Sequence, residues 1–207
     1  MSMKKLALFV VFTLVAFVAS AQTQINWSVK AGLGFSNWMG DGADGVKAKL
    51  GYKVGVGADI PFNEMWSFQT GLNLVSKGVK GNAEDNTDIT VNQLYLELPL
   101  KAAIHLKTAN NFDVVFNAGP YLAYGVGGKI KAEYSGVELS FDTFGKTTVE
   151  GESIEGLKRF DAGLGLGVAF DFDRWIIGLD TQLGMVKLGE EDAPRNMSFF
   201  VTAGFKF

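Results

Sequence analysis

The chain of 207 residues contains no cysteine, only four prolines and a single histidine. Without cysteine it is neither a disulfide scaffold nor a lipoprotein anchored through an acylated cysteine. The scarcity of proline beside 26 glycines indicates many strands and tight turns rather than a disordered linker. The net charge is only −3, from 19 basic and 22 acidic residues, and this small excess gives no indication of a nucleic-acid partner.

Long hydrophobic runs are also missing after residue 21, so no membrane-spanning helix is expected there. The one apolar run, residues 6–19, has fourteen residues, whereas a spanning helix needs ~20. It follows a short basic start and precedes an A-x-A motif at residues 19–21. These features predict a cleaved signal peptide, residues 1–21, followed by one mature barrel domain, residues 22–207.

Apolar and polar residues alternate along most of the mature chain, with the period of two that a β-strand with unlike faces requires. Eight such segments predict an all-β protein, an eight-stranded antiparallel up-and-down transmembrane barrel. Pro99 and Pro120 fall inside predicted strands and indicate bulges or local distortions. The predicted strands cover residues 27–36, 49–60, 66–74, 93–106, 112–122, 159–172, 175–185 and 197–207.

The predicted connections alternate between long and short. Polar loops at residues 37–47, 77–90 and 187–196 and a long connection at residues 125–158 follow every second strand, and the turns between them are short. This asymmetry is typical of transmembrane barrels, whose extracellular loops are long and periplasmic turns short. Alternation within residues 125–158 predicts a hairpin that projects from the barrel. Its exposed strands would suit a protein-docking edge.

Residue size indicates which face of the barrel points outward. Thirteen glycines of the predicted strands share the polar face, while nearly all bulky aromatic residues share the apolar face. An eight-stranded barrel has room inside only for modest side chains, so the glycine-rich, charged face fits the lumen and the aromatic face fits lipid. The alternative is an exported soluble barrel of lipocalin type, which would turn its apolar face inward around a hydrophobic ligand.

The last predicted strand alternates regularly and ends on an aromatic residue. This pattern resembles the end of bacterial outer-membrane barrels, where the assembly machinery reads it as a signal. The resemblance implies an assembly signal at Phe205 and Phe207. In a transmembrane barrel this strand pairs with the first one, because no unsatisfied sheet edge can face lipid.

Three further segments resemble the PorT-like, porin-family outer-membrane β-barrels of Gram-negative bacteria: residues 94–100 (LYLELPL), 117–122 (NAGPYL) and 159–167 (RFDAGLGLG). The resemblance extends over essentially the whole mature chain, and its motifs are mainly structural. It implies a barrel in the cell outer membrane, exported through the inner membrane by a cleaved signal peptide. Members of this family are mostly of unassigned function. PorT itself is linked to protein secretion, and nothing in these segments singles out that role.

Six basic and six acidic residues fall on the polar face of the predicted strands. In a narrow lumen such charges are costly unless they are paired. Glu97 and Lys101 lie about 13 Å apart on one strand, at ~3.3 Å per residue, so each needs a partner on another strand. A salt-bridged plug is favoured over an ion pathway, because eight strands leave little free bore. The predicted luminal network contains Lys30, Lys53, Asp59, Glu97, Lys101, Arg159, Asp161 and Asp180, and Lys49, Asp113, Asp171 and Lys206 share its face.

His105, the only histidine, is the one residue that invites an enzymatic interpretation. Its predicted place beside a short turn argues against this, because barrel enzymes work at the outer surface. No serine or aspartate can be assigned to a catalytic triad with it, and a lone histidine makes a poor metal site. We therefore expect no catalytic residue, no metal and no cofactor, and interpret His105 as a satisfied interior side chain.

The sequence thus predicts an integral outer-membrane barrel that acts as a structural or binding protein or as a narrow pore. Its expected partners are outer-membrane lipid, the barrel-assembly machinery during biogenesis and a protein at the outer loops, and the barrel is expected to be a monomer. Two alternatives are kept. The first is the soluble ligand-binding barrel, and the second, less favoured, is an outer-membrane barrel enzyme.

Overall fold

The computed structural model describes residues 25–207 except 84–86, 109–111, 135–136, 150–151 and 191. The predicted signal peptide and its cleavage site therefore lie outside the described residues. Among the described residues, no helix is long and apolar enough to cross a membrane.

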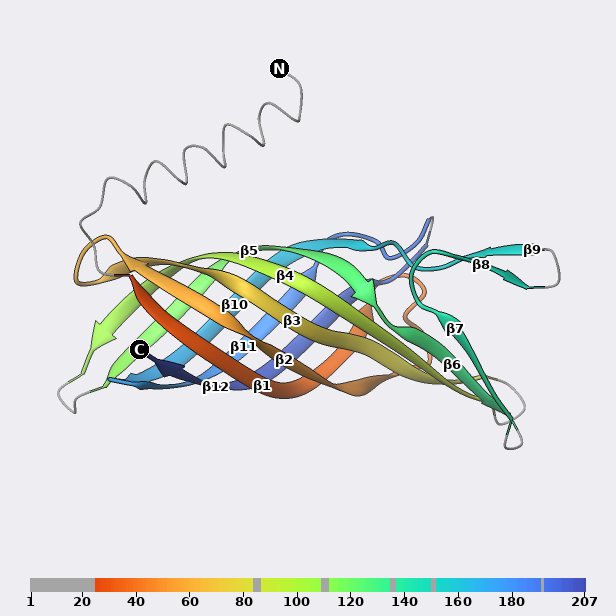
Figure 1. Ribbon diagram of the computed structural model, residues 1–207, viewed down its shortest axis with the longest axis horizontal. Helices are drawn as coiled ribbons and strands as arrows, with labels where there is room; N and C mark the ends of the chain where they lie inside the picture. The colour runs from red at the N-terminus through yellow and green to blue at the C-terminus, as the bar shows by residue number, and fades with distance from the viewer. Residues whose placement is uncertain (1–24, 84–86, 109–111, 135–136, 150–151, 191) are drawn as a thin grey trace, which may run out of the picture.

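Eight long strands form a closed antiparallel barrel (Figure 1). The last strand pairs with the first from Ser28↔Lys206 to Met39↔Arg195, and β3 pairs with β4, so the ring has no open edge. The eight strands are β1 (Asn26–Met39), β2 (Val46–Pro61), β3 (Trp66–Ala83), β4 (Thr87–Lys107), β5 (Asp113–Gly127), β10 (Phe160–Phe172), β11 (Trp175–Gly184) and β12 (Arg195–Lys206).

The two ends of the barrel differ. The connections β2–β3, β4–β5 and β10–β11 and the C-terminus lie at one end, which we call the short-turn end (Figure 1). The other connections lie at the opposite, long-loop end. This confirms the predicted eight-stranded architecture. The alternation of long and short connections holds only in part, because β3 ends at Ala83 and β4 begins at Thr87.

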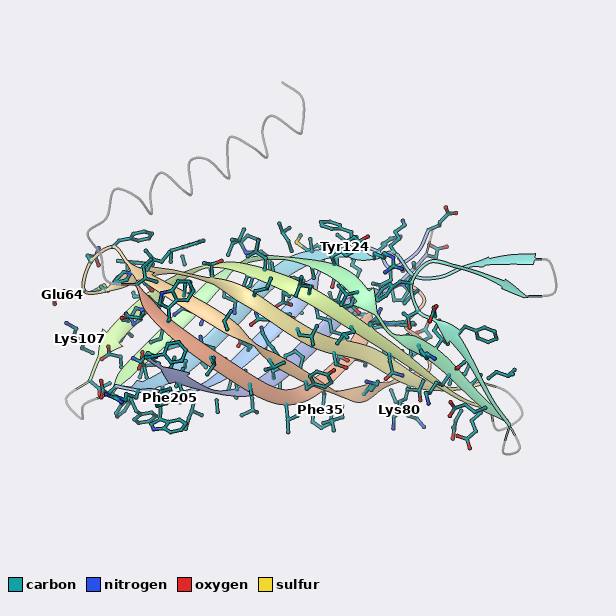
Figure 2. The ribbon with its side chains drawn as sticks, viewed as in Figure 1. Phe35, Glu64, Lys80, Lys107, Tyr124 and Phe205 are labelled. Atoms are coloured by element: carbon teal, nitrogen blue, oxygen red, sulfur yellow. The ribbon has the colours of Figure 1, made fainter. Side chains whose placement is uncertain are left out.

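The outer surface is apolar and the interior is polar, the reverse of a soluble barrel. Leu33, Phe35 and Trp175 are 64%, 59% and 61% exposed, whereas Glu97 is 0% exposed. Figure 2 shows Phe35 and Tyr124 projecting from the outer surface. The lipocalin-type alternative is therefore wrong, because the apolar face points away from the lumen.

Glycine on the inner face allows neighbouring strands to approach closely, as at the seam between β1 and β12. A Cβ atom at Gly34 would lie only 1.9 Å from the carbonyl oxygen of Phe199 on β12, so no side chain fits there. Residue size in the sequence predicts a lumen that holds only modest side chains, but the structure shows large ones there as well. Tyr95, Tyr121 and Phe200 are enclosed in it with at most 1% exposure. The small inner-face residues around them leave the space that these rings fill.

The prediction of a polar loop at residues 77–90 is wrong, because β3 extends to Ala83 and β4 begins at Thr87. Their pairing runs without a break from Lys77↔Gln93 to Ala83↔Thr87. The polar composition of this stretch does not end the strands, since a strand that leaves a membrane no longer needs an apolar outer face. β3 and β4 therefore extend beyond the barrel wall at the long-loop end (Figure 1).

The connection from β5 to β10 contains two hairpins rather than the single one predicted. β6 (Lys129–Tyr134) pairs with β4 and with β7 (Val137–Asp142), which extends the β3–β4 projection into a sheet that we call the arm. β8 (Lys146–Val149) and β9 (Glu152–Glu155) form a separate hairpin. Thr143 and Phe144 lie in the segment between β7 and β8, and their side chains are buried.

The two prolines predicted to distort the strands coincide with gaps in the pairing of β4. The β3–β4 register is the same on both sides of Pro99, and the β4–β5 register is the same on both sides of Pro120. Proline lacks the N–H that a ladder needs, so the ladder is interrupted locally. Neither proline causes a bulge. The register shifts lie elsewhere, between Ala48 and Lys53 of β2 and at Leu94/Tyr95 of β4.

Candidate functional site: the luminal network and its cap

The lumen is organised along β4, whose inward side chains lie at successive heights in the barrel. Glu97 occupies the middle of this strand. Its Oε1 lies 3.2 Å from Nζ of Lys53 and accepts a 2.8 Å hydrogen bond from Nε2 of Gln182, and its Oε2 lies 3.8 Å from Nζ of Lys77. These partners come from β2, β11 and β3, so one carboxylate joins four strands across the lumen.

A second layer lies between Glu97 and the long-loop end. Nζ of Lys77 lies 3.3 Å from Oδ2 of Asp161 and 4.4 Å from the centre of the Tyr121 ring. The same carboxylate oxygen accepts hydrogen bonds from Tyr121 and Asn196, at 3.3 and 3.0 Å. A cation over an aromatic face is attracted by the ring as well as by the carboxylate. Asp161 is thus held by β3, β5 and β12.

Lys77 is the main residue of this network that the sequence did not predict, because it lay in the expected loop. Its side chain is 0% exposed and lies within ion-pair distance of two carboxylates, those of Glu97 and Asp161. A signal was present in the sequence. Ser67, Gln69 and Asn73 alternate on the polar face of β3, and continuing the same parity reaches Lys77.

The segment between β7 and β8 caps the lumen at the long-loop end. The Phe144 ring lies edge-on to Tyr95, with 5.3 Å between the ring centres, and joins Tyr95, Tyr121 and Ala123 in one buried cluster. A Cβ atom on Gly125 would come within 2.6 Å of the Phe144 ring, so glycine is required beneath the cap.

Arg159 secures this cap and does not join the predicted ion-pair network. Its guanidinium donates to the carbonyl oxygens of Gly125 and Phe144, at 2.9 and 3.4 Å, and lies 5.7 Å from the Phe144 ring centre. Arg159 immediately precedes β10 at the rim, where backbone carbonyls are the nearest acceptors. Its placement therefore differs from the expected luminal one.

Below Glu97, towards the short-turn end, the lumen is more open. Nζ of Lys101 lies 2.6 Å from Oδ1 of Asp180 and donates to Asn117 at 2.9 Å. Lys30 has no carboxylate within ion-pair distance among the described residues. Two polar cavities of about 60 Å³ each occupy this half, and Lys30 lines both.

At the short-turn end His105 contacts both a serine and an aspartate, which the sequence did not predict. Its Nε2 lies 2.8 Å from Oγ of Ser67 and 3.4 Å from Oδ2 of Asp59, and Asp59 also accepts from Gln69 at 2.7 Å. A catalytic triad needs the serine and the carboxylate on opposite ring nitrogens. Here both approach the same nitrogen, so the cluster lacks the geometry of a triad. In the described residues, no group of three or more histidine, aspartate or glutamate side chains is suited to hold a metal ion.

The remaining predicted residues lie at the same end. Lys206 and Asp171 form an ion pair of 2.5 Å at the luminal margin. Phe205 packs edge-on against Trp175, with 5.2 Å between ring centres, and Phe207 is 76% exposed on the outside. Figure 2 shows Phe205 at this margin of the barrel.

Comparison with known proteins agrees with this architecture. The family model described as the outer membrane protein beta-barrel domain matches residues 20–188. Among curated proteins, no sequence matches the chain. The narrower PorT-like expectation is not confirmed by these matches.

Several solved outer-membrane proteins are similar in structure at low sequence identity. OprG from Pseudomonas aeruginosa gives a TM-score of 0.49 at 10% identity, covering 89% of this chain and 97% of OprG. Ail of Yersinia pestis, solved with a heparin analogue, gives 0.47 at 14% identity, covering 89% and 99%. Neisserial surface protein A gives 0.44 at 11% identity, covering 87% and 95%. On the strength of the family match and the closed barrel, the chain belongs to the outer membrane protein beta-barrel domain family and resides in the outer membrane.

Proposed function

We propose that this protein is a non-conducting barrel that anchors a binding surface in the outer membrane. The observation that carries the proposal is the blocked lumen. Phe144, Tyr95, Tyr121, Lys77 and Glu97 follow one another from the long-loop end to the middle of the barrel, each at most 5% exposed. A structural or binding role fits this arrangement better than a narrow pore.

The energetics of the blocked half also favour a closed state. An ion crossing the Glu97 layer would have to separate buried charges from their partners. Removing one member of a buried ion pair typically costs ~3–5 kcal/mol, because the other charge is left uncompensated. Lys53 would lose its carboxylate in this way, and Lys77 would keep only that of Asp161.

The arm supplies the surface that the barrel would present. Among the described strands, β7 pairs only with β6, so its other edge is free. Leu139 of β7 is 57% exposed. A free strand edge with exposed apolar side chains is suited to adding an extended segment of another protein. The proposed partner at the outer loops would therefore bind the arm.

Two further partnerships belong to the proposal. Phe205 and Phe207 would be read by the barrel-assembly machinery during biogenesis. The barrel would act as a monomer in outer-membrane lipid, because its strand ladder closes on itself without a second copy. An enzymatic role is not proposed, since the His105 cluster lacks the geometry of a triad.

Planar-bilayer recording of the refolded protein tests the closed lumen. We expect no discrete openings in the wild type, and measurable conductance only when Phe144→Ala and Tyr95→Ala are combined with Glu97→Gln, which also removes the ion pairs of the deeper layer. Leu139→Ala is the matched control, because it shortens an apolar side chain on the arm and leaves the lumen intact. Regular single-channel openings in the wild type would overturn the proposal in favour of a narrow pore.

A further inference from the structure

The half of the lumen nearer the short-turn end contains a cation that forms no ion pair within the described residues. Lys30 on β1 points inward and lines both cavities. Within the described residues it forms no ion pair. The carboxylate-containing layer of Glu97 lies above these cavities, so they end blindly towards the long-loop end.

The inner cavity has an excess of positive charge. Its lining includes three ammonium groups, from Lys30, Lys53 and Lys101, and one carboxylate, from Asp180. Asp180 is engaged by Lys101 at 2.6 Å, and Lys53 is engaged by Glu97, which does not line the cavity. Lys30 is therefore the ammonium group of this cavity that has no carboxylate at ion-pair distance, and Asp180 and Asp59 act on it only from farther away.

The other acidic groups nearby are engaged through one oxygen each, and Oδ1 of Asp59 has no hydrogen-bond partner. Asp59 and Asp171 line the outer cavity only. Asp59 accepts from Gln69 and contacts His105, and Asp171 is paired with Lys206. The inner cavity also contains the side-chain amide of Asn117, whose oxygen accepts from Lys101.

We infer that the inner cavity binds a small monovalent inorganic anion, of the size of chloride, beside Lys30. An ammonium group withdrawn from bulk water is costly without a counter-charge, and a compact anion supplies one. The volume of about 60 Å³ is several times the ~10–15 Å³ that one water needs by the same measure, so a chloride and a few waters fit.

The route of entry is the outer cavity, which shares Lys30 with the inner one and lies nearer the short-turn end. The anion passes Asp59 and Asp171, and these carboxylates disfavour multivalent anions. The Glu97 layer stops it from going further. The site therefore binds an anion without conducting it, and the inference holds whether or not the arm binds a protein.

Thermal unfolding of the refolded full barrel in detergent tests this site. Chloride is titrated at constant ionic strength against a large organic anion, gluconate. We expect the melting temperature of the wild type to rise saturably, by about 3–6 °C at ten times the dissociation constant. Lys30→Gln should abolish this dependence. Lys107→Gln, at an exposed turn where Lys107 pairs with Glu64, should retain it.

A second measurement avoids reliance on variants. Crystals of the wild type soaked in bromide should give an anomalous peak in the inner cavity within contact distance of the Lys30 ammonium. No saturable chloride effect, an equal effect in Lys30→Gln, or an inner cavity without bromide would each overturn the inference. Channel openings in bilayers would instead count against the closed lumen alone, so the two proposals fail separately.

Discussion

Glu97 is fully buried, and its two oxygens meet side chains from three other strands. Lys53 depends on it for charge compensation, Lys77 shares it with Asp161, and Gln182 donates to it. Asp161 has the equivalent role in the next layer towards the long-loop end, where it shares Lys77. At the residue scale, the upper lumen is thus stabilised by two carboxylates, each with several donors.

Replacing Glu97 by glutamine should therefore destabilise the barrel. The substitution keeps the size of the side chain but leaves the buried ammonium group of Lys53 without its counter-charge. We expect a loss of ~3–5 kcal/mol in the free energy of unfolding, as is typical when one member of a buried ion pair is removed. Urea unfolding of the protein in lipid vesicles measures it.

The matched control is Glu64→Gln at the short-turn end. Glu64 pairs with Lys107, but the two side chains are 91% and 63% exposed, and Figure 2 shows both at this end of the barrel. Exposed ion pairs contribute little, so the unfolding midpoint should hardly move. Equal unfolding of Glu97→Gln and the wild type would show that Glu97 does not stabilise the lumen.

At the element scale, strands with similarly exposed apolar residues face two different surroundings, lipid around the barrel and water around the arm. β10 is part of the barrel wall, and its Leu166 is 53% exposed on the outer face. β7 lies in the arm, and its Leu139 is 57% exposed. The two leucines are exposed to a similar extent, but only Leu166 lies on the outer face of the barrel, which in an outer-membrane barrel contacts lipid.

This pair provides a direct test of the lipid-facing surface. Leu166→Arg places a charge near the middle of the membrane, at an expected cost of ~2–4 kcal/mol in the free energy of unfolding. Leu139→Arg should cost little, because that site meets water. The penalty at Leu166 should shrink in thinner bilayers, where the arginine can reach the interface. Equal penalties at both sites, or no dependence on lipid chain length, would contradict the assignment.

At the scale of the whole molecule, stability depends on closing the ring. β12 pairs with β1 on one side and with β11 on the other, so the last strand completes the barrel. The backbone N–H of Phe207 donates to the carbonyl oxygen of Trp27 at 3.2 Å, but its side chain is 76% exposed. The ring therefore contributes little to packing inside the protein.

Deleting Phe207 should reduce assembly in the outer membrane without affecting export. The reason is that the terminal aromatic group would be lost as a signal, while the ladder loses only one hydrogen bond. The amount of heat-modifiable, folded protein in outer-membrane fractions measures assembly. Phe207→Tyr, which keeps the aromatic ring, should assemble normally. Full assembly of the deletion variant would exclude a terminal signal at this residue.

The alternation of residues was sufficient to predict the eight barrel strands, their order, and an apolar outer and polar inner face. The reason is that successive side chains of a strand point to opposite faces of the sheet. The alternation did not identify strand residues that lie beyond the membrane, where the outer face need not be apolar. Residues 77–90 are polar, yet they continue β3 and β4, since beyond the membrane a strand can carry polar residues on both faces. Lys77 was missed for this reason, although its parity matched that of Asn73.

The sequence by itself determined which residues face the lumen and which face lipid, since this follows from parity along each strand. Only the tertiary structure decided which luminal charges meet. The pairs Lys53–Glu97 and Lys101–Asp180 depend on strand register and on side-chain reach across the barrel, and neither is encoded by local spacing. The same holds for Phe144, which comes from a loop and closes the lumen because the chain turns back over Tyr95. Lys30 forms no ion pair, because the carboxylates that act on it, those of Asp180 and Asp59, lie beyond ion-pair distance.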